Sequence, residues 1–278
     1  MIGFFSPSLA LKLRYFSNRK RWPNLQQPKD ISEILIRNVV TGKINTLSEL
    51  ADKYAVRKYV SEKGLNDILV PLLGVYNNVE DIDFTKLPNS FALKLNYGAG
   101  MNVICKDKAI LNIDKAKNKL NKWLTNKCSY SVIEQHYNFI PRKIICEAFI
   151  DDGTGELPID YKIMCIKGSP ICILACANRG YSNEVHLPFD LQWNFLSDWS
   201  RQKFAEIPKP TNLNLMLDIA KSLSSGLDVV RVDLYSVHGK IYFGELTLTP
   251  SGCIFNNWTQ KALDELGYYY LKEKLPKS

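Results

Sequence analysis

The chain has 278 residues, of which 46% are apolar and 23% charged, and its formal net charge is +8. This length and apolar content can supply one large core or two compact lobes, which excludes a disordered chain. The positive charge favours an anionic partner. Because no run of Lys and Arg exceeds three residues, nucleotide, acidic polysaccharide, nucleic acid and membrane surface all remain open.

Cysteine and histidine usage bounds the chemistry further. The histidines, His136, His186 and His238, lie far apart, which argues against a zinc site. No Ser/His/Asp or Cys/His arrangement is apparent, so no protein nucleophile is expected. The seven cysteines are odd in number and form no C-x-x-C pair, so they are expected to be reduced packing residues of a cytoplasmic protein: Cys105, Cys128, Cys146, Cys165, Cys172, Cys176 and Cys253.

The N-terminal segment is basic and predicted to be helical. Residues 1–5 are apolar, but Pro7 interrupts them and no cleavage site follows, so neither a signal peptide nor a membrane span is expected. Ser6-Pro7 favours a helix start, with Leu9, Leu13 and Phe16 on one side and basic residues around them. This helix either packs on the body of the protein or rests on anionic lipid.

Two more helices are predicted before the first strand. Asp30 to Val40 indicates a helix that Gly42 ends. Residues 46–63 predict one continuous helix with a Thr46/Glu49 capping box. On composition alone, Lys53 belongs to the solvated face of that helix.

A glycine-bearing turn follows the predicted strand Phe91–Asn96. It contains Gly98 and Gly100 and runs into a further strand, Val103–Lys106. Backbone N–H groups can close around a phosphate at such a turn, because a missing Cβ allows close approach. The turn lacks the G-K-[ST] ending of a Walker loop, and a strand rather than a helix follows. An ordinary hairpin turn remains an alternative.

Helices and strands alternate in the rest of the chain, without an internal repeat. The aromatic segment 181–210 is predicted to be irregular, and it either helps to bind an acceptor or packs on the body. Further helices are predicted at 111–125, 212–226 and 258–266, and further strands at 70–75, 143–151, 161–167 and 170–178.

Two acids lie inside a predicted hairpin, residues 229–248, with its turn at His238-Gly239. Asp233 and Glu245 are flanked by apolar residues and fall nearly opposite each other, where like charges repel unless something positive lies between them. Mg²⁺ suits such a pair of carboxylates. Arg231 lies on the same face as Asp233 and can contact a phosphoryl oxygen. A surface hairpin with ordinary salt bridges is the alternative.

The order R-x-D, E-x-T and T-P-S-G in this hairpin resembles the metal end of ATP-grasp ligases. These motifs are Arg231-Val232-Asp233, Glu245-Leu246-Thr247 and residues 249–252; many family members have Asn where this chain has Thr247. The chain resembles the TupA-like branch over about residues 7–270, most clearly in the segments GKIYFGELTLTPSG and, upstream, DKYAVRKYV and FALKLNYGAGMNVI. That branch occurs in bacterial capsule, teichuronic acid and O-antigen gene sets.

The resemblance implies an α+β ATP-grasp fold in which two α+β lobes clamp ATP. The expected divisions are a helical basic N-terminal arm at 1–45, a small lobe with the glycine loop at 46–146, and a large lobe with the metal-binding hairpin at 147–278.

The resemblance also implies roles for individual residues. Lys53, Lys94, Gly98 and Gly100 would bind the phosphates of ATP, Glu147 and Phe149 the adenine, and Asp160 the ribose; Asp233, Glu245 and Thr247 would hold Mg²⁺; and Arg231, Lys162 and Arg179 would act as catalytic cations beside the γ-phosphate or an acidic substrate.

The implied activity is an ADP-forming ligation of a carboxylate to an amine through an acyl phosphate. For this branch the carboxylate would be a uronic acid of an acidic polysaccharide or lipid-linked oligosaccharide, and the amine an amino acid or other amine. A cytoplasmic protein is expected, with possible peripheral contact at the inner face of the membrane and no nucleic-acid partner. The alternatives are a glycosyltransferase or other transferase of the same pathway, an ATP-grasp variant that phosphorylates without ligating, and a basic non-catalytic binding protein.

Overall fold

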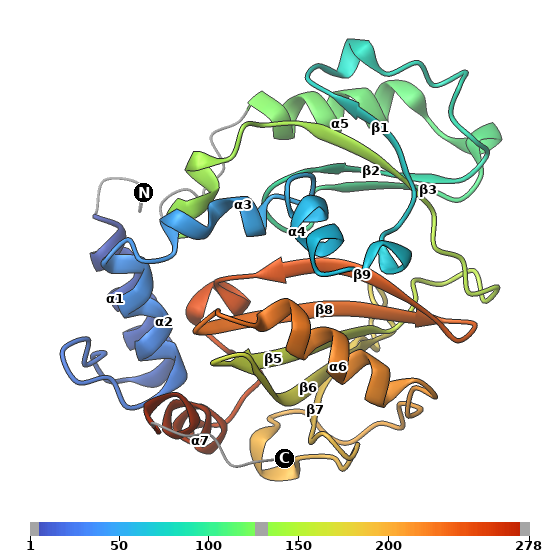
Figure 1. The fold of residues 1–278 in the computed structure, drawn as a ribbon. Helices are drawn as coiled ribbons and strands as arrows, with labels where there is room; N and C mark the ends of the chain where they lie inside the picture. Colours follow the sequence, from blue (N-terminus) through green and yellow to red (C-terminus); the bar gives the residue numbers. More distant parts are fainter. Residues whose placement is uncertain (1–5, 126–132, 273–278) are drawn as a thin grey trace.

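Two antiparallel sheets lie one above the other in the computed structural model, which describes residues 6–125 and 133–272 (Figure 1). The upper sheet has the order β1-β4-β2-β3, and the lower has the order β7-β6-β5-β8-β9. The strands are β1 (Leu72–Tyr76), β2 (Phe91–Leu95), β3 (Asn102–Cys105), β4 (Ile144–Ala148), β5 (Asp160–Ile166), β6 (Ser169–Ala177), β7 (Val185–Phe189), β8 (Val229–Val237) and β9 (Lys240–Thr247).

Helices cover both sheets. In Figure 1, α5 lies over the upper sheet and α6 beside the lower one, while α1, α2 and α7 gather at one side. The α-helices are α1 (Pro7–Arg19), α2 (Ile31–Val40), α3 (Ser48–Ala51), α4 (Val56–Glu62), α5 (Ile113–Thr125), α6 (Leu213–Ser224) and α7 (Gln260–Leu271). Short 3₁₀ turns are η1 (Asn45–Leu47), η2 (Asn66–Ile68), η3 (Val79–Asp81), η4 (Lys108–Ile110), η6 (Gln135–Phe139), η7 (Ser197–Trp199) and η8 (Pro250–Cys253).

The alternation of residues along β8 separates a core face from a polar face. Val230, Val232 and Leu234 are fully buried in the large core that α6 shares. The intervening residues point to the opposite face, because side chains alternate along a strand. There Val229 packs in a second core with α2 and α7, and further along the strand the same face carries Arg231 and Asp233. The charged residues of β8 therefore begin where its packing against α2 and α7 ends.

The N-terminal helix packs on the body of the protein, as one of its two interpretations predicted. Ala10, Leu11 and Tyr15 are buried, and the Tyr15 hydroxyl donates a hydrogen bond to Asp30 at 2.6 Å. The apolar side predicted from Leu9, Leu13 and Phe16 is not the buried one, because Leu13 and Phe16 are each 39% exposed.

The prediction of one continuous helix over residues 46–63 was wrong. The segment forms η1, α3 and α4, with a break at Asp52, whose backbone is extended. The Asp52 carboxylate accepts hydrogen bonds from the Tyr54 amide (2.8 Å) and from the Asn96 side chain (2.9 Å). Such side-chain bonds compete with helical ones. Thr46 makes no cap, since its hydroxyl donates to the Lys43 carbonyl.

Several smaller expectations have clear outcomes. Segment 181–210 is not wholly irregular, since it contains β7. The predicted lobe boundary at 146/147 falls inside β4, which lies wholly in the upper sheet. The division into lobes thus stays a prediction. Six cysteines are buried and free, and Cys128 and residues 1–5 lie outside the described residues. None of the described helices has the length and apolarity to cross a bilayer.

Candidate functional site

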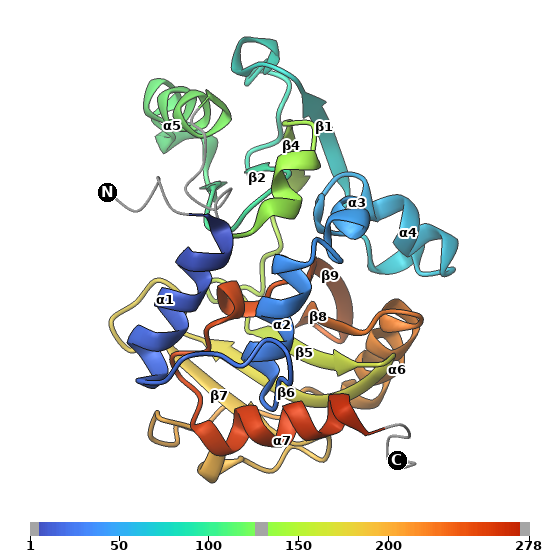
Figure 2. The same ribbon diagram turned by 90° about the vertical axis from the view of Figure 1, so that its left-hand side faces the viewer.

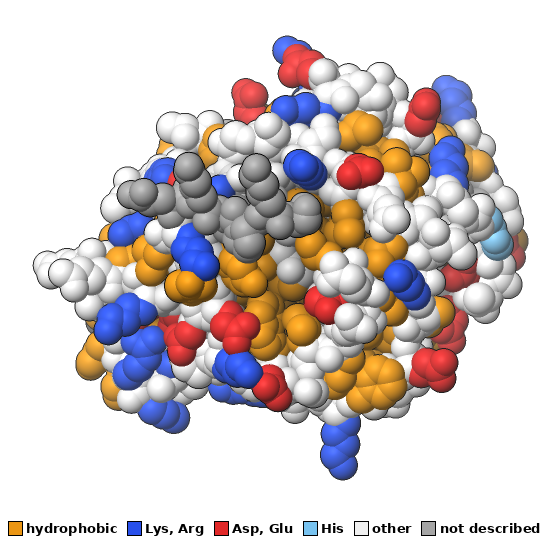
Figure 3. Space-filling view, turned by 60° about the horizontal axis from the view of Figure 1, so that its bottom comes forward, with side chains coloured by type: hydrophobic (Ala, Val, Ile, Leu, Met, Phe, Trp, Pro, Cys, Tyr) orange, Lys and Arg blue, Asp and Glu red, His pale blue; other side chains and the backbone are white. Residues whose placement is uncertain are grey.

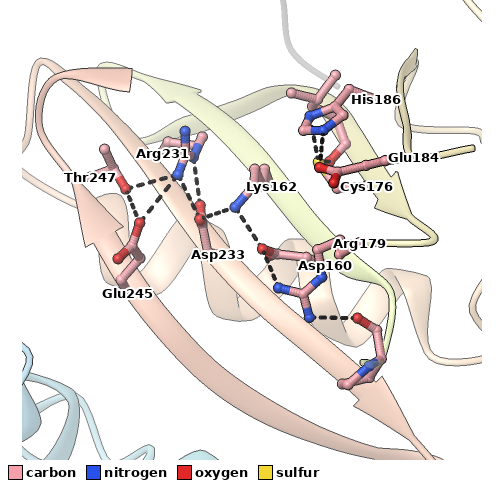
Figure 4. A network of polar contacts seen from close by, with 12 residues as sticks. Asp160, Lys162, Cys176, Arg179, Glu184, His186, Arg231, Asp233, Glu245 and Thr247 are labelled. Atoms are coloured by element: carbon pink, nitrogen blue, oxygen red, sulfur yellow. Dashed lines mark hydrogen bonds and ion pairs between the residues drawn. The ribbon is translucent and has the colours of Figure 1, made fainter. Parts of the chain in front are cut away.

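Asp233 and Glu245 stand directly opposite each other on paired strands. In the β8–β9 ladder Asp233 pairs with Glu245, and on its other side Asp233 pairs with Lys162 of β5. Gly244 forms a bulge in β9 just before Glu245, and a Cβ there would lie 3.1 Å from the Asp233 carbonyl oxygen. The predicted opposition of the two acids is confirmed, and three charged side chains share one face of the sheet (Figure 4).

The guanidinium of Arg231 joins the two carboxylates. Its Nε and Nη2 donate to Oδ1 and Oδ2 of Asp233, each at 2.7 Å, and Nη2 also lies 3.3 Å from Oε1 of Glu245. Thr247 completes this group, because its hydroxyl accepts from Arg231 at 3.1 Å and donates to Glu245 at 2.8 Å. The Arg231 guanidinium therefore lies between the two carboxylates, the position in which the sequence predicts Mg²⁺.

A chain of ion pairs continues across β5. Lys162 Nζ donates to Asp233 and to Asp160, both at 2.6 Å, and Arg179 lies 3.4 Å from the same Asp160 oxygen. Arg179 is held further by the Pro158 carbonyl and the Tyr235 ring. Oδ1 of Asp160 and Nε of Arg179 are buried without a hydrogen-bond partner in the described structure. This part of the network has donor and acceptor capacity that the chain itself does not use.

Lys53 connects the two sheets. Its Nζ donates to the carbonyl of Gly98 at 2.5 Å and lies 3.5 Å from Oε2 of Glu245. Lys53 lies beside the glycine turn because the helix breaks at Asp52. After the break, the Lys53 amide donates a hydrogen bond to the carbonyl of Asn96, the residue just after β2. Gly98 and Gly100 both have positive φ, at 67° and 74°. The turn backbone therefore needs glycine.

A second charged cluster lies in the upper sheet. Glu147 of β4 accepts from Lys94 Nζ at 2.7 Å and from Arg57 at 3.1 Å. Arg57 also donates to the Val70 carbonyl. Phe149 follows β4 and is half-buried. Thus Lys94 and Glu147 lie on the two inner strands of the upper sheet and Phe149 just after β4, whereas Asp160 and Lys162 lie on β5 of the lower sheet and Arg179 just after β6.

The electrostatics of the site favour the charged forms of Glu245, Lys162 and Arg231, whereas burial raises the pKa of Asp233 against the lowering effect of Arg231 and Lys162. Burial raises the pKa of Glu245, but Lys53, Arg231 and Lys162 outweigh it, so the pKa falls from 4.5 to about 2. Burial lowers the pKa of Lys162, and the neighbouring carboxylates, Asp233 first, raise it well above its ordinary value. The pKa of Arg231 is raised in the same way, again mainly by Asp233.

The lowered pKa of Glu245 predicts a pH-dependent stability. Because its folded pKa lies below its unfolded value, Glu245 stabilises the fold above about pH 4.5 and loses this contribution as pH falls toward about 2. In thermal unfolding followed by circular dichroism, the gap between wild type and Glu245→Gln should be widest at neutral pH and should shrink below pH 4.5. Glu62→Gln, at a side chain 62% exposed, is the control. A gap independent of pH would contradict the assignment.

The oxygen donors of the hairpin fit a hard cation such as Mg²⁺. The side chains of Asp233, Glu245 and Thr247 offer only oxygen, Glu245 is 27% exposed at its side chain, and within residues 6–125 and 133–272 Lys53 is the one cation paired with its Oε2. Both oxygens of Asp233 are occupied by Arg231 and Lys162, so a metal there would have to take over one of these contacts. Among the described residues, no group of three His, Cys, Asp or Glu side chains converges as a metal site.

Two residues near the hairpin had no signal in the sequence. Glu134 is buried and accepts a hydrogen bond from Thr249 at 2.5 Å, just beyond β9. Burial raises the pKa of Glu134, and both Glu245 and Arg231 act on it electrostatically. Tyr137, one 3₁₀ turn later, is influenced by the same two side chains, and burial raises its pKa. Neither residue belongs to a recognisable motif, so only the fold associates them with the site.

The expectation that no Cys/His arrangement exists was wrong. Cys176 and His186 are partners on β6 and β7, with Sγ 3.3 Å from Nδ1, and Nε2 of His186 lies 2.6 Å from Glu184 (Figure 4). Burial raises the pKa of Cys176 to about 12, so its thiol stays protonated and is a poor nucleophile. In the aromatic segment nearby, Trp193 stacks on Phe189 at 4.3 Å, whereas Tyr181 and Phe204 are exposed, so packing and a contact with the acceptor both remain predictions.

Comparison with known proteins gives a family and a set of similar folds. The family described as TupA-like ATPgrasp matches residues 32–271. No curated protein matches the chain. Similar solved structures include D-alanine–D-alanine ligase from Bacillus anthracis, with 19% identity and a TM-score of 0.47 over 83% of this chain and 71% of that one.

Two other solved structures are similar to a comparable degree. The ADP complex of N5-carboxyaminoimidazole ribonucleotide synthetase has 14% identity and a TM-score of 0.46 over 73% of this chain. L-amino acid ligase from Bacillus licheniformis has 14% identity and a TM-score of 0.47 over 87%. The chain spans 46% and 52% of the lengths of these two proteins.

With TM-scores below 0.5, these likenesses add no weight, and the assignment rests on the family model. That model spans most of the chain, and the predicted α+β ATP-grasp fold class is confirmed. The chain belongs to the TupA-like ATP-grasp family.

Proposed function

We propose that this protein is an ATP-dependent ligase that joins a carboxylate to an amine. The observation that carries the proposal is the link through Lys53, which contacts both the glycine turn of the upper sheet and Glu245 of the lower sheet. A triphosphate held between these two points would lie against Lys53 and the Arg231–Asp233–Glu245 group. Family membership supports the same nucleotide.

The proposed reaction has two steps. An oxygen of the substrate carboxylate attacks the γ-phosphorus of ATP, and the bond to the β-phosphate oxygen breaks. ADP departs, and the transferred phosphoryl group forms an acyl phosphate with the substrate. The amine nitrogen then attacks the carbonyl carbon, phosphate leaves with the bonding electrons, and the nitrogen loses a proton. Buried cations stabilise the negative charge that develops in both steps. Arg231, Lys162 and Arg179 are the side chains proposed for this task.

Other residues are proposed to position the nucleotide. Lys53, Lys94, Gly98 and Gly100 would bind the phosphates, because amide N–H groups and ammonium groups suit phosphate oxygens. Glu147 and Phe149 would contact the adenine, and Asp160 would accept from the ribose hydroxyls. The unpartnered Oδ1 of Asp160 supports that role. Asp233, Glu245 and Thr247 would hold Mg²⁺, which when bound neutralises phosphate charge.

A thermal-shift experiment with three ligands tests the proposal. Mg-ATP should raise the unfolding temperature, whereas a Mg-UDP-sugar and RNA should not, because the proposed site recognises a triphosphate. The double variant Asp233→Asn with Glu245→Gln should lose the response to Mg-ATP. A shift with the UDP-sugar and none with ATP would favour a glycosyltransferase and refute the ligase.

The proposed carboxylate is a uronic acid of a surface polysaccharide or lipid-linked oligosaccharide, and the amine is an amino acid or another amine. The net positive charge of +8 is compatible with an acidic acceptor. Mass spectrometry of the surface polysaccharide from cells with and without the gene tests this substrate class. Loss of an amide-linked substituent is expected, and an unchanged polysaccharide would refute it.

A further inference from the structure

The N-terminal segment concentrates the positive charge of the protein. Residues 1–29 contain six Lys and Arg residues and no Asp or Glu, so this tenth of the chain supplies +6 of the net +8. Over most of the face drawn in Figure 3, acidic and basic side chains are interspersed. The family model begins at residue 32, after this segment. The charge is therefore a local property of residues 6–29, the first part of the predicted N-terminal arm.

The basic residues of this arm divide into two groups. Arg19 donates to the carbonyls of Phe255 and Trp258, and Arg21 pairs with the buried Asp30 and Glu33. These two side chains attach the arm to the body. The second group forms no ion pair in the described part of the chain: Lys12, Arg14, Lys20 and Lys29. Of these, Lys12 and Lys20 are the cations available to an anionic surface beside α1, because Arg14 extends toward the η8 turn.

Apolar side chains are exposed between these cations. Leu13 and Phe16 are each 39% exposed on the outer side of α1, and Trp22 is 55% exposed. Lys20 adopts a left-handed conformation, with φ of 58°, which turns the chain back so that Trp22 stacks on Phe16 at 4.9 Å. In Figures 1 and 2, α1 lies at the edge of the molecule with α2 on its inner side.

We propose that this outer face of α1 is a peripheral membrane-binding surface that recognises anionic phospholipid headgroups. An exposed aromatic pair beside unpaired Lys and Arg is the composition of helices that lie in the membrane interface. Isolated cations would suit RNA equally, but exposed Leu, Phe and Trp on one face favour a bilayer.

The surface adjoins the candidate site. Arg14 extends from α1 toward the η8 turn after β9, where a Cβ at Gly252 would lie 3.3 Å from its Nη1. Arg14 also acts electrostatically on the buried Glu134. A helix seated on a bilayer would bring this end of the site to the lipid surface, where the carboxylate of a lipid-linked acceptor lies. This consequence for the substrate depends on the proposed function, whereas the membrane surface itself does not.

Vesicle flotation of the full chain tests the proposal. The protein should float with vesicles of phosphatidylcholine and phosphatidylglycerol at low salt, and it should bind weakly to phosphatidylcholine alone or at high salt. Lys12→Gln with Lys20→Asn should reduce binding about 25-fold, because each cation near an anionic surface contributes about fivefold. Lys58→Gln with Lys86→Gln, at side chains 84% and 83% exposed, is the matched charge control.

The apolar part of the surface has its own variants. Phe16→Ser with Trp22→Ser should abolish flotation and leave the unfolding temperature unchanged, since both side chains are exposed. Ile110→Ser with Phe204→Ser, 82% and 60% exposed elsewhere, should float like the wild type. Brominated lipid should quench the fluorescence of Trp22, and the quenching should be absent in Trp22→Phe.

Three outcomes would overturn the proposal. The first is no flotation of the wild type with anionic vesicles at low salt. The second is equal flotation of the surface variants and their controls. The third is binding to an RNA probe, or self-association, that these variants remove while vesicles are not bound. Because none of these measurements uses ATP, failure here leaves the proposed ligase activity untouched, and loss of the Mg-ATP response leaves the membrane surface standing.

Discussion

Asp233→Asn should destabilise the protein by about 3 kcal/mol, because removing one partner of a buried ion pair leaves the remaining charges uncompensated. Asp233 is 1% exposed, and both its oxygens are bonded to Arg231 and Lys162. Urea unfolding followed by circular dichroism measures the change. Asp198→Asn is the matched control: Asp198 also pairs with a lysine at 2.6 Å, but its side chain is 68% exposed, so little change is expected.

Removing a cation as well should recover part of this loss. In Asp233→Asn with Lys162→Met, the lysine that Asp233 neutralised is replaced by an apolar side chain of similar length, so the double variant should be more stable than the sum of the two single changes. Purely additive effects would show that Lys162 is neutralised mainly by Asp160, its other partner at 2.6 Å.

The hairpin shows what the sequence alone can predict about the site. Alternation and the His238-Gly239 turn bring the two acids close together, but the register of that turn alone would pair Asp233 with Gly244. The bulge at Gly244 shifts the register by one residue and places Glu245 opposite Asp233. The sequence also indicated that a positive group must lie between them. It did not indicate that Arg231, two residues before Asp233, occupies that position, because a side-chain contact depends on rotamers that periodicity does not specify.

The helix prediction over 46–63 failed for a reason outside the segment. Its pattern is helical, but Asp52 bonds to Asn96, forty-four residues later. A long-range hydrogen bond thus overrides local propensity and produces the break that brings Lys53 to the glycine turn. Glu134 could not be predicted from the sequence for a similar reason, because its hydrogen-bond partner Thr249 is 115 residues away. In both cases the contact that matters for the site joins segments that sequence periodicity treats separately.

Lys53, positioned by the break at Asp52, connects the two sheets. The glycine turn and the acidic hairpin each have an ordinary structural explanation when taken alone. Lys53 favours a functional site over two separate structural features, because its side chain, only 13% exposed, contacts both the glycine turn and the acidic hairpin. A lysine that bonds a backbone carbonyl and lies near a carboxylate can exchange either contact for a phosphate oxygen, which is a stronger, charge-assisted partner than the carbonyl.

Lys53→Met should therefore weaken binding of Mg-ATP by about 10- to 100-fold, which corresponds to the loss of one charge-assisted hydrogen bond. Isothermal titration calorimetry with a non-hydrolysable ATP analogue and Mg²⁺ measures the affinity directly. The unfolding temperature without nucleotide should fall as well, because Lys53 also bonds the Gly98 carbonyl at 2.5 Å and lowers the pKa of Glu245, so affinities are compared well below the unfolding temperatures of the variants. Lys58→Met on α4, at a side chain 84% exposed, is the control and should bind as the wild type does. Equal affinities for the two variants would remove Lys53 from the nucleotide site and, with it, the contact on which the ligase proposal rests.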